Sequence, residues 1–132
     1  MTAPQDNVAL VEAFWAALAR RDFAAVGAIM APRGHYVDVP VMEIDKGAFG
    51  PAETEARLRL GIEPLAAYVL HDGPIIASGD YVVTEHRETW TWDDSASVTL
   101  PFTSVMEVRD GKVERWWDYL DLSTLMNAAP AW

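Results

Sequence analysis

The sequence predicts an α+β fold in which a curved antiparallel sheet wraps around N-terminal helices in the shape of a cone. Three observations predict it. Apolar residues recur at helical spacing near the N-terminus, apolar and polar residues alternate as in strands from Leu65 onward, and hairpin signals such as Arg109-Asp110-Gly111 separate the later strands. Helices followed by long antiparallel strands are typical of α+β proteins, and a strongly bent sheet would enclose a conical pocket.

The first element is a helix over Asp6–Arg20. Val8, Val11, Trp15 and Leu18 fall at helical spacing and form an apolar stripe along one face. We expect this stripe to join the core, with Trp15 and Leu18 also able to line the pocket.

Two more helices follow, with different start signals. Asp22 is a suitable N-cap for a short helix over Phe23–Met30, which Pro32-Arg33-Gly34 should end. Pro51–Leu60 is predicted as a helix because proline favours the first helical turn, and Gly61 should stop it.

The remaining elements are mostly strands. Glu43–Phe49 is expected to be a loop, and Ser123 is a candidate cap for a short C-terminal helix over Thr124–Asn127. The expected strands are His35–Val39, Leu65–Leu70, Ile75–Ala77, Tyr81–Trp92, Ala96–Val108 and Lys112–Leu120.

Composition narrows the possible functions. The 132 residues, 51% of them hydrophobic, predict a single domain over 1–132 with a sizeable core. The net charge of −10 argues against nucleic acid and anionic membrane as partners, and against a strongly anionic substrate. The absence of cysteine excludes thiol catalysis and disulfides. No segment resembles a signal peptide or membrane span, so we expect a cytoplasmic protein.

Asp118 is the most informative candidate for a functional residue. In the predicted strand it lies on the same face as Trp116 and Leu120, because alternate residues of a strand share a face. A carboxylate among apolar neighbours is costly unless it is paired or hydrogen-bonded. Asp118 therefore needs partners, or its perturbed ionisation has a use.

Two other strands supply partners for Asp118. Tyr36 and Asp38 share one face of the first strand, and His86 and Glu88 share a face with Trp90 in the strand Tyr81–Trp92. We expect the latter face to point inward because it carries more aromatic mass. The candidate catalytic residues are Tyr36, Asp38, His86, Glu88 and Asp118, and the candidate substrate-binding residues are Trp15, Leu18, Trp90, Leu100, Phe102, Trp116 and Leu120.

Such an enclosure suits acid–base chemistry. Carboxyl groups that share a site of low dielectric push their pKa values apart, so that one keeps a proton while another is ionised. A general acid and a general base at neutral pH require that split. The three histidines lie on separate elements without ligand spacing, so we expect neither a metal site nor a cofactor.

Two runs of residues resemble the limonene-1,2-epoxide hydrolase family. They are Trp116-Trp117-Asp118-Tyr119-Leu120-Asp121-Leu122 and Thr84-Glu85-His86-Arg87-Glu88, preceded by two helices and the pattern Tyr-x-Asp-x-Pro. The resemblance covers nearly the whole chain. That family belongs to the larger group folded like nuclear transport factor 2, which includes SnoaL-like cyclases and ketosteroid isomerase. It implies an NTF2-like α+β barrel and a homodimer, which the six tryptophans also suit.

The resemblance also implies roles for individual residues. Asp118 matches the aspartate that activates water, and Tyr36 matches the tyrosine that helps to position it. Asp38 stands in place of an asparagine, His86 in place of an arginine that bridges two aspartates, and Glu88 in place of the acid that protonates the epoxide oxygen. The implied function is a cofactor-independent hydrolase that adds water to an epoxide of a small apolar substrate of the terpenoid, steroid or polyketide type.

Two alternatives remain open. Asp38 falls where ketosteroid isomerase has its base, although Phe14 and Thr103 stand near the positions of its two oxyanion donors. His86 and Asp118 resemble the His and Asp of a SnoaL-like cyclase, so an isomerase, cyclase or dehydratase is the first alternative. The second is a domain that binds a hydrophobic ligand without catalysis, because fold alone does not determine function.

Overall fold

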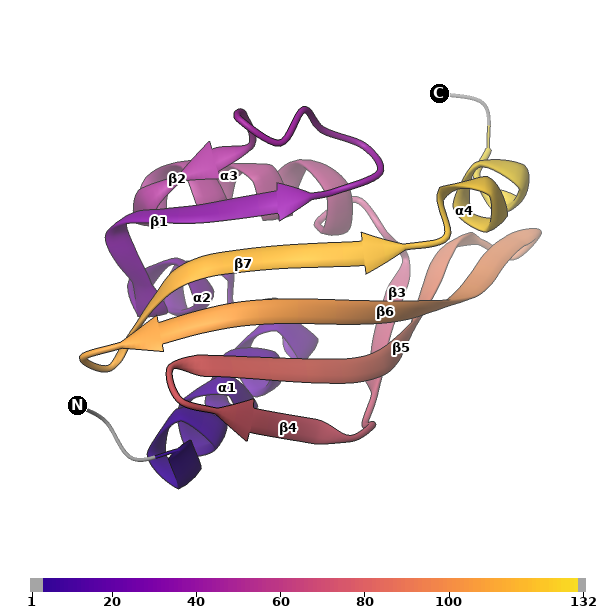
Figure 1. The fold of residues 1–132 in the computed structure, drawn as a ribbon. Coiled ribbons are helices and arrows are strands. Elements are labelled where there is room, and N and C mark those ends of the chain that lie inside the picture. The colour runs from indigo at the N-terminus through magenta and orange to yellow at the C-terminus, as the bar shows by residue number, and fades with distance from the viewer. Residues whose placement is uncertain (1–3, 131–132) are drawn as a thin grey trace.

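A computed structural model describes residues 4–130, which form four helices and a curved sheet that does not close on itself (Figure 1). The predicted α+β class is therefore confirmed. The helices are α1 (Pro4–Ala19), α2 (Phe23–Ile29), α3 (Gly50–Ile62) and α4 (Leu122–Ala128). The strands are β1 (Met30–Asp38), β2 (Ala48–Phe49), β3 (Ala67–His71), β4 (Ile75–Ser78), β5 (Tyr81–Asp93), β6 (Ala96–Arg109) and β7 (Lys112–Leu120).

The sheet has the strand order β2-β1-β7-β6-β5-β3, and β4 also pairs with β5. All of these pairs are antiparallel except β1 with β7, which are parallel. The expectation of antiparallel pairing is thus wrong for one pair. No hairpin joins β1 to β7, because the other five strands lie between them in the chain, so their relative direction is not fixed by a turn. Their parallel register places Asp38 beside Asp118.

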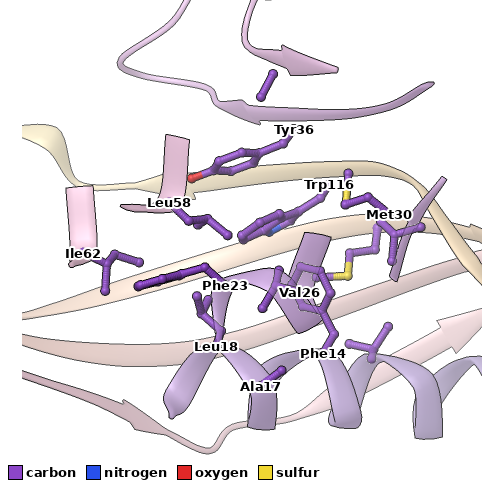
Figure 2. Packing of buried hydrophobic residues seen from close by; sticks show 14 of the residues in the cluster. Phe14, Ala17, Leu18, Phe23, Val26, Met30, Tyr36, Leu58, Ile62 and Trp116 are labelled. Atoms are coloured by element: carbon purple, nitrogen blue, oxygen red, sulfur yellow. The ribbon is translucent and has the colours of Figure 1, made fainter. Parts of the chain in front are cut away.

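The core lies between the sheet and the first three helices, which cover one of its faces (Figure 1). Trp116 is its centre: its ring stacks on Tyr36 with centroids 4.0 Å apart and meets the edge of Phe14 at 4.7 Å (Figure 2). The aromatic layer fills this part of the sheet's concave side. The opposite end, between α3 and α4, is left for a cavity.

The inward stripe of α1 differs from the predicted one at two positions. Val8 is half-buried and outside the core cluster, and its neighbour Asn7 is fully covered instead. Val11 and Leu18 are fully covered as expected, but the large side chain between them is Phe14 rather than Trp15. Phe14 follows Val11 by three residues and precedes Leu18 by four, so it continues the same helical face. Trp15 lies at the edge of that face, where its ring contacts Phe14 and Trp116.

β1 begins earlier than predicted, because the segment expected to break α2 is itself extended. Pro32 and Gly34 lie inside the strand, where the β1–β7 register shifts between Met30 and His35. Proline is tolerated at such an irregularity because it lacks only a ladder donor. Gly34 is required by close approach, since a Cβ there would lie 2.5 Å from the carbonyl oxygen of Val113.

The connection after α3 also differs from its prediction. The helix continues through Gly61 to Ile62, and the strand expected from Leu65 starts at Ala67. The backbone N–H of Leu65 instead donates to the carbonyl of Ile62 at 3.1 Å, which closes a turn. Leu65 is buried at the cavity, so its apolar character reflects the cavity wall rather than a strand.

Two smaller differences concern caps and loops. Ala48 and Phe49, expected in a loop, form β2 by pairing with β1. The C-terminal helix is capped by Asp121 rather than Ser123, because the Asp121 carboxylate accepts from the backbone N–H of Thr124 at 3.2 Å. Asp22 caps α2 as predicted. Among residues 4–130, no helix has the length and hydropathy needed to cross a bilayer.

Candidate active site

An apolar cavity of about 490 Å³ opens at the end of the cone between α3 and α4. Five of the seven predicted substrate-binding residues line it: Leu18, Trp90, Phe102, Trp116 and Leu120. Leu122, Leu125 and Met126 of α4 contribute to the wall as well. The cavity therefore has the apolar lining and size typical of small-molecule sites.

Trp15 and Leu100 are not part of the cavity wall. Leu100 is completely covered in a second small cluster with Phe102 and Leu125. Trp15 packs against His86, with ring centroids 4.5 Å apart. Both residues pack against other side chains of the site and do not face the cavity.

Four of the five predicted catalytic residues reach the cavity: Tyr36, Asp38, Glu88 and Asp118. β1 and β7 are neighbours, and Asp38 lies directly beside Asp118 in their register. Ser104 lies beside Asp118 on the other side, from β6. The predicted inward face of β5 is the buried one, since Thr84, His86 and Glu88 are all at most 7% exposed.

Asp118 is held through one of its two carboxyl oxygens. Its Oδ1 accepts a hydrogen bond from Trp116 Nε1 at 2.6 Å and a short one from Ser104 Oγ. No other hydrogen bond to the Asp118 side chain is formed within residues 4–130, so Oδ2 is without a partner in a residue that lines the cavity. Burial raises the pKa of Asp118 well above its usual value, the charges of Asp38 and Glu88 raise it further, and the two hydrogen bonds only partly oppose this rise.

Asp38 has a similar half-satisfied arrangement. Tyr36 Oη donates to its Oδ2 at 2.8 Å, and Oδ1 accepts no hydrogen bond from the rest of the described chain. Burial raises the pKa of Asp38 from 3.8 to about 6; the hydrogen bond from Tyr36 and the charge of Arg57 oppose the rise, and the charge of Glu88 adds to it. Asp38 is thus ionised for the most part at neutral pH, close to the point at which it takes up a proton.

The two aspartates differ in how readily they ionise. They lie side by side on adjacent strands in an apolar enclosure, where two like charges are costly, and the charge of Asp38 raises the pKa of Asp118. The pKa of Asp118 rises well above its usual value and that of Asp38 rises to about 6, so we place a proton on Asp118 at neutral pH. Its bonded Oδ1 directs that proton to Oδ2.

Glu88 is bonded at both oxygens. Tyr68 Oη and Trp90 Nε1 each donate to Oε1 at 2.9 Å, and His86 Nε2 lies 2.8 Å from Oε2. The phenol of Tyr68 stays protonated as a donor, because burial and the charge of Glu88 raise its pKa well above the usual value. Glu88 is therefore an anchored carboxylate rather than one with an oxygen free for the cavity.

His86 bonds to Glu88 and not to Asp118. Its ring lies between Trp15 and Phe102, stacked on the latter with an interplanar angle of 10°. Within residues 4–130 it makes no other side-chain hydrogen bond, and its buried Nδ1 has no partner. The expected bridge between two carboxylates is thus not formed in this structure.

Three residues of the site are absent from the sequence-based prediction: Ser104, Tyr68 and Arg57. Ser104 could have been found, since it is a polar residue on the inward face of β6 between Phe102 and Met106. Arg57 gives no such signal because it lies in a helix segment rich in charged residues. Across residues 4–130, no group of three or more His, Cys, Asp or Glu side chains is arranged to hold a metal ion.

Comparisons with known proteins agree with this fold. The family model for the SnoaL-like domain matches residues 11–116. An LEH-like epoxide hydrolase from M. tuberculosis is similar in structure, with 26% identity, a TM-score of 0.78, and coverage of 95% of this chain and 90% of that one.

Two further solved structures share the fold at lower identity. A hypothetical protein of ketosteroid isomerase-like fold from Catenulispora acidiphila has 18% identity, a TM-score of 0.80 and 90% coverage of each chain. An NTF2-like protein from Burkholderia xenovorans has 21% identity, a TM-score of 0.78, and coverage of 98% of this chain and 100% of that one. Among curated proteins, none matches the sequence.

Proposed function

The chain belongs to the SnoaL-like domain family, and we propose that it is a cofactor-independent enzyme that adds water to the epoxide of a small apolar molecule. One observation carries the proposal: Asp38 and Asp118 lie side by side in an apolar cavity, each with one oxygen tied down and one free. A base, Asp38, and an acid, Asp118, can therefore contact the same bound molecule. The 26% identity with the LEH-like epoxide hydrolase supports epoxide opening as the reaction.

The reaction balances with these two residues. Asp38 takes a proton from a water molecule through its free Oδ1, and the water oxygen forms a bond to one epoxide carbon. The carbon–oxygen bond of the ring breaks, and Asp118 delivers its proton from Oδ2 to the leaving epoxide oxygen. The product is a vicinal diol, and transfer of one proton from Asp38 to Asp118 restores the starting state.

Tyr36 and Glu88 support the pair in different ways. Tyr36 fixes the orientation of Asp38 by donating to Oδ2, which leaves Oδ1 for water. Glu88 supplies a fixed negative charge that raises the pKa values of both aspartates. His86 positions Glu88 from behind and does not reach the substrate.

These roles differ from the ones that the family resemblance implies, in which Asp118 is the base and Glu88 the acid. Three donors occupy both oxygens of Glu88, and a proton on its Oε2 would point at His86 rather than into the cavity. Asp118 carries the raised pKa and the free oxygen instead. We therefore assign the acid to Asp118 and the base to Asp38.

A second function is favoured by the pKa of Asp38, about 6. A carboxylate base of that strength opposite a neutral carboxylic acid is also suited to proton abstraction next to a carbonyl group, as in isomerases and cyclases. The substrate would then be an enone or a polyketide-like ketone. Binding of a hydrophobic ligand without turnover is the third reading of the same cavity.

Turnover of a panel of substrates in ¹⁸O-labelled water separates these functions. Limonene 1,2-epoxide and cyclohexene oxide should give diols carrying one labelled oxygen, detected by mass spectrometry. The Asp118→Asn variant should lose activity by about 10²- to 10⁴-fold, the usual contribution of an acid–base group. Its affinity for limonene, an apolar ligand that carries no epoxide, should stay unchanged, as followed by the intrinsic tryptophan fluorescence, to which Trp90, Trp92 and Trp116 of the cavity wall contribute.

A matched control is Glu85→Gln, which makes the same carboxyl-to-amide change at an exposed position of β5. It should keep full activity. Formation of conjugated enones from β,γ-unsaturated ketones, with no diol, would favour the isomerase instead. Binding without turnover of any substrate in the panel would leave the ligand-binding function.

The homodimer stays a prediction. Large apolar side chains are exposed on the sheet strands, including Val69, Ile76, Tyr81 and Tyr119. They are the kind of surface that a second subunit would cover.

A further inference from the structure

Arg57 is the single cationic side chain that lines the cavity in the part of the chain described. The other ionisable groups of the wall are acids and phenols: Tyr36, Asp38, Tyr68, Glu88 and Asp118. Arg57 comes from α3 and is half-buried. Val41 and Leu60, which line the same cavity, are 49% and 71% exposed, so this part of the wall lies at the opening.

The guanidinium of Arg57 has no protein partner within residues 4–130, where it forms neither an ion pair nor a hydrogen bond. Arg59, two residues further along α3, shows the contrast. It bonds to Glu55 at 2.8 Å and to Glu63 at 2.5 Å on the outer side of the helix. Arg57 acts only from a distance on Asp38, whose pKa its charge lowers.

Gly61 lines the same cavity as Arg57. Gly61 lies one helical turn later and so neighbours Arg57 on the helix surface. A Cβ atom at Gly61 would meet nothing within 4 Å. No side chain at that position therefore covers the guanidinium, and a ligand entering the cavity can reach it.

A guanidinium presents several N–H donors in a planar fork and matches a carboxylate in a bidentate manner. Here that fork is partly removed from water and has no acceptor. The acidic groups deeper in the cavity would repel an anion, so Arg57 makes the opening the one place in the cavity where a negative group is favoured.

We infer that Arg57 is a specificity-determining residue that binds the carboxylate of an amphipathic substrate, with the apolar body in the cavity and the reacting group beside Asp38 and Asp118. The inference rests on the proposed function and names its substrate class. The net charge of −10 still disfavours a polyanion, but one carboxylate held at Arg57 avoids the deeper acids. The substrate class is thus an apolar monocarboxylic acid that carries the reacting group away from its acid end.

Ligand binding tests the inference without any turnover. Geranic acid, methyl geranate and geraniol share one apolar body and differ in the end group. Each is titrated at pH 8 while the intrinsic tryptophan fluorescence is followed, to which Trp90, Trp92 and Trp116 of the cavity wall contribute. The wild type should bind geranic acid about tenfold to a hundredfold more tightly than geraniol or the ester, the range typical of a hydrogen-bonded charge.

Three variants identify the residue responsible. Arg57→Gln should remove the preference for the acid and leave geraniol binding within about twofold of wild type. Arg57→Lys should keep part of the preference, because it retains the charge and loses the bidentate fork. Arg59→Gln removes the same charge from the outer side of α3 and should keep the wild-type ratio of affinities.

Equal affinity of the wild type for the acid and the alcohol would overturn the inference, as would an unchanged ratio in Arg57→Gln. Failure of the proposed function looks different. If the wild type prefers the acid, the preference depends on Arg57 and no epoxide is turned over, the hydrolase function is contradicted. Arg57 would then still be the residue that selects the ligand. If diol forms but the acid is not preferred, only the inference about Arg57 is contradicted.

Discussion

Two kinds of carboxyl group share one cavity in this protein, and they are held in opposite ways. Glu88 on β5 receives three donors on its two oxygens. Asp38 on β1 and Asp118 on β7 are each bonded through a single side-chain oxygen; Asp118 is as deeply buried as Glu88, and Asp38 is half-buried. The comparison shows that burial raises the pKa values of Asp38 and Asp118, and that their hydrogen bonds leave one oxygen of each free to take up or release a proton, whereas both oxygens of Glu88 are engaged.

The largest effect that tests this comparison is expected from Asp38→Asn. A pKa raised from 3.8 in the unfolded chain to about 6 in the folded protein means that the folded state binds more protons between these values. Protonated Asp38 therefore contributes its full share to the free energy of unfolding below about pH 4, and this contribution is lost as the pH rises through about 6. At pH 8 the amide should raise the free energy of unfolding by on the order of 3 kcal/mol, because it removes that cost.

Urea unfolding of both proteins from pH 3.5 to pH 8 measures this difference, which should vanish at the acidic end. Asp93→Asn is a control of opposite sign. Asp93 is exposed, and its hydrogen bonds from Ser95 lower its pKa, so its replacement should reduce stability at neutral pH and not in acid. Equal pH profiles for wild type and Asp38→Asn would mean that Asp38 has an ordinary pKa.

Glu88→Gln should have a smaller effect of the opposite direction. Its amide cannot accept all three hydrogen bonds, so one of the buried donors Tyr68, Trp90 or His86 is left without a partner. An unpaired buried polar group costs about 1–3 kcal/mol, and we expect a loss of stability of that size at pH 7.

Tyr68→Phe removes one donor and leaves Glu88 with two, so it should cost only about 1 kcal/mol. Both variants can be compared with wild type by urea unfolding. A gain of stability in Glu88→Gln, like that of Asp38→Asn, would show that the two kinds of carboxyl group are not different after all.

The sequence predicted the inward faces of the strands well, because alternation determines them. His86, Glu88 and Asp118 are buried as their strand positions implied, and Tyr36 and Asp38 share one face of β1. The resemblance to the nuclear transport factor 2 group rests on the runs Trp116–Leu122 and Thr84–Glu88, and the SnoaL-like family match over residues 11–116 confirms the group. These features depend on local pattern and are visible in one strand at a time.

Relations between strands could not be predicted in the same way. Nothing in the local sequence says that β1 pairs in parallel with β7, and that pairing is what brings Asp38 beside Asp118. Nor does it say that His86 turns toward Glu88 alone, since the choice depends on how Trp15 and Phe102 hold its ring. The raised pKa values of Asp38 and Asp118 depend on burial and on neighbouring charges that only the assembled sheet brings together.

Segments with proline or glycine were also ambiguous. From the local sequence alone, Pro32 and Gly34 predict the end of an element. An irregular position within a strand accommodates both residues equally well. Gly61 was expected to stop α3, yet the helix tolerates it because its position faces open space. Tertiary surroundings decide such cases.

The central claim is that Asp118 holds a proton at neutral pH while Asp38 does not. Carbon-13 NMR of the aspartate carboxyl groups, with the two signals assigned through Asp118→Asn and Asp38→Asn, measures it directly. The account predicts that at pH 7.5 the Asp118 carbon has the chemical shift of a neutral carboxylic acid and the Asp38 carbon that of a carboxylate, which becomes protonated near pH 6. An Asp118 signal that is ionised at pH 7.5 and titrates near pH 4 would contradict it.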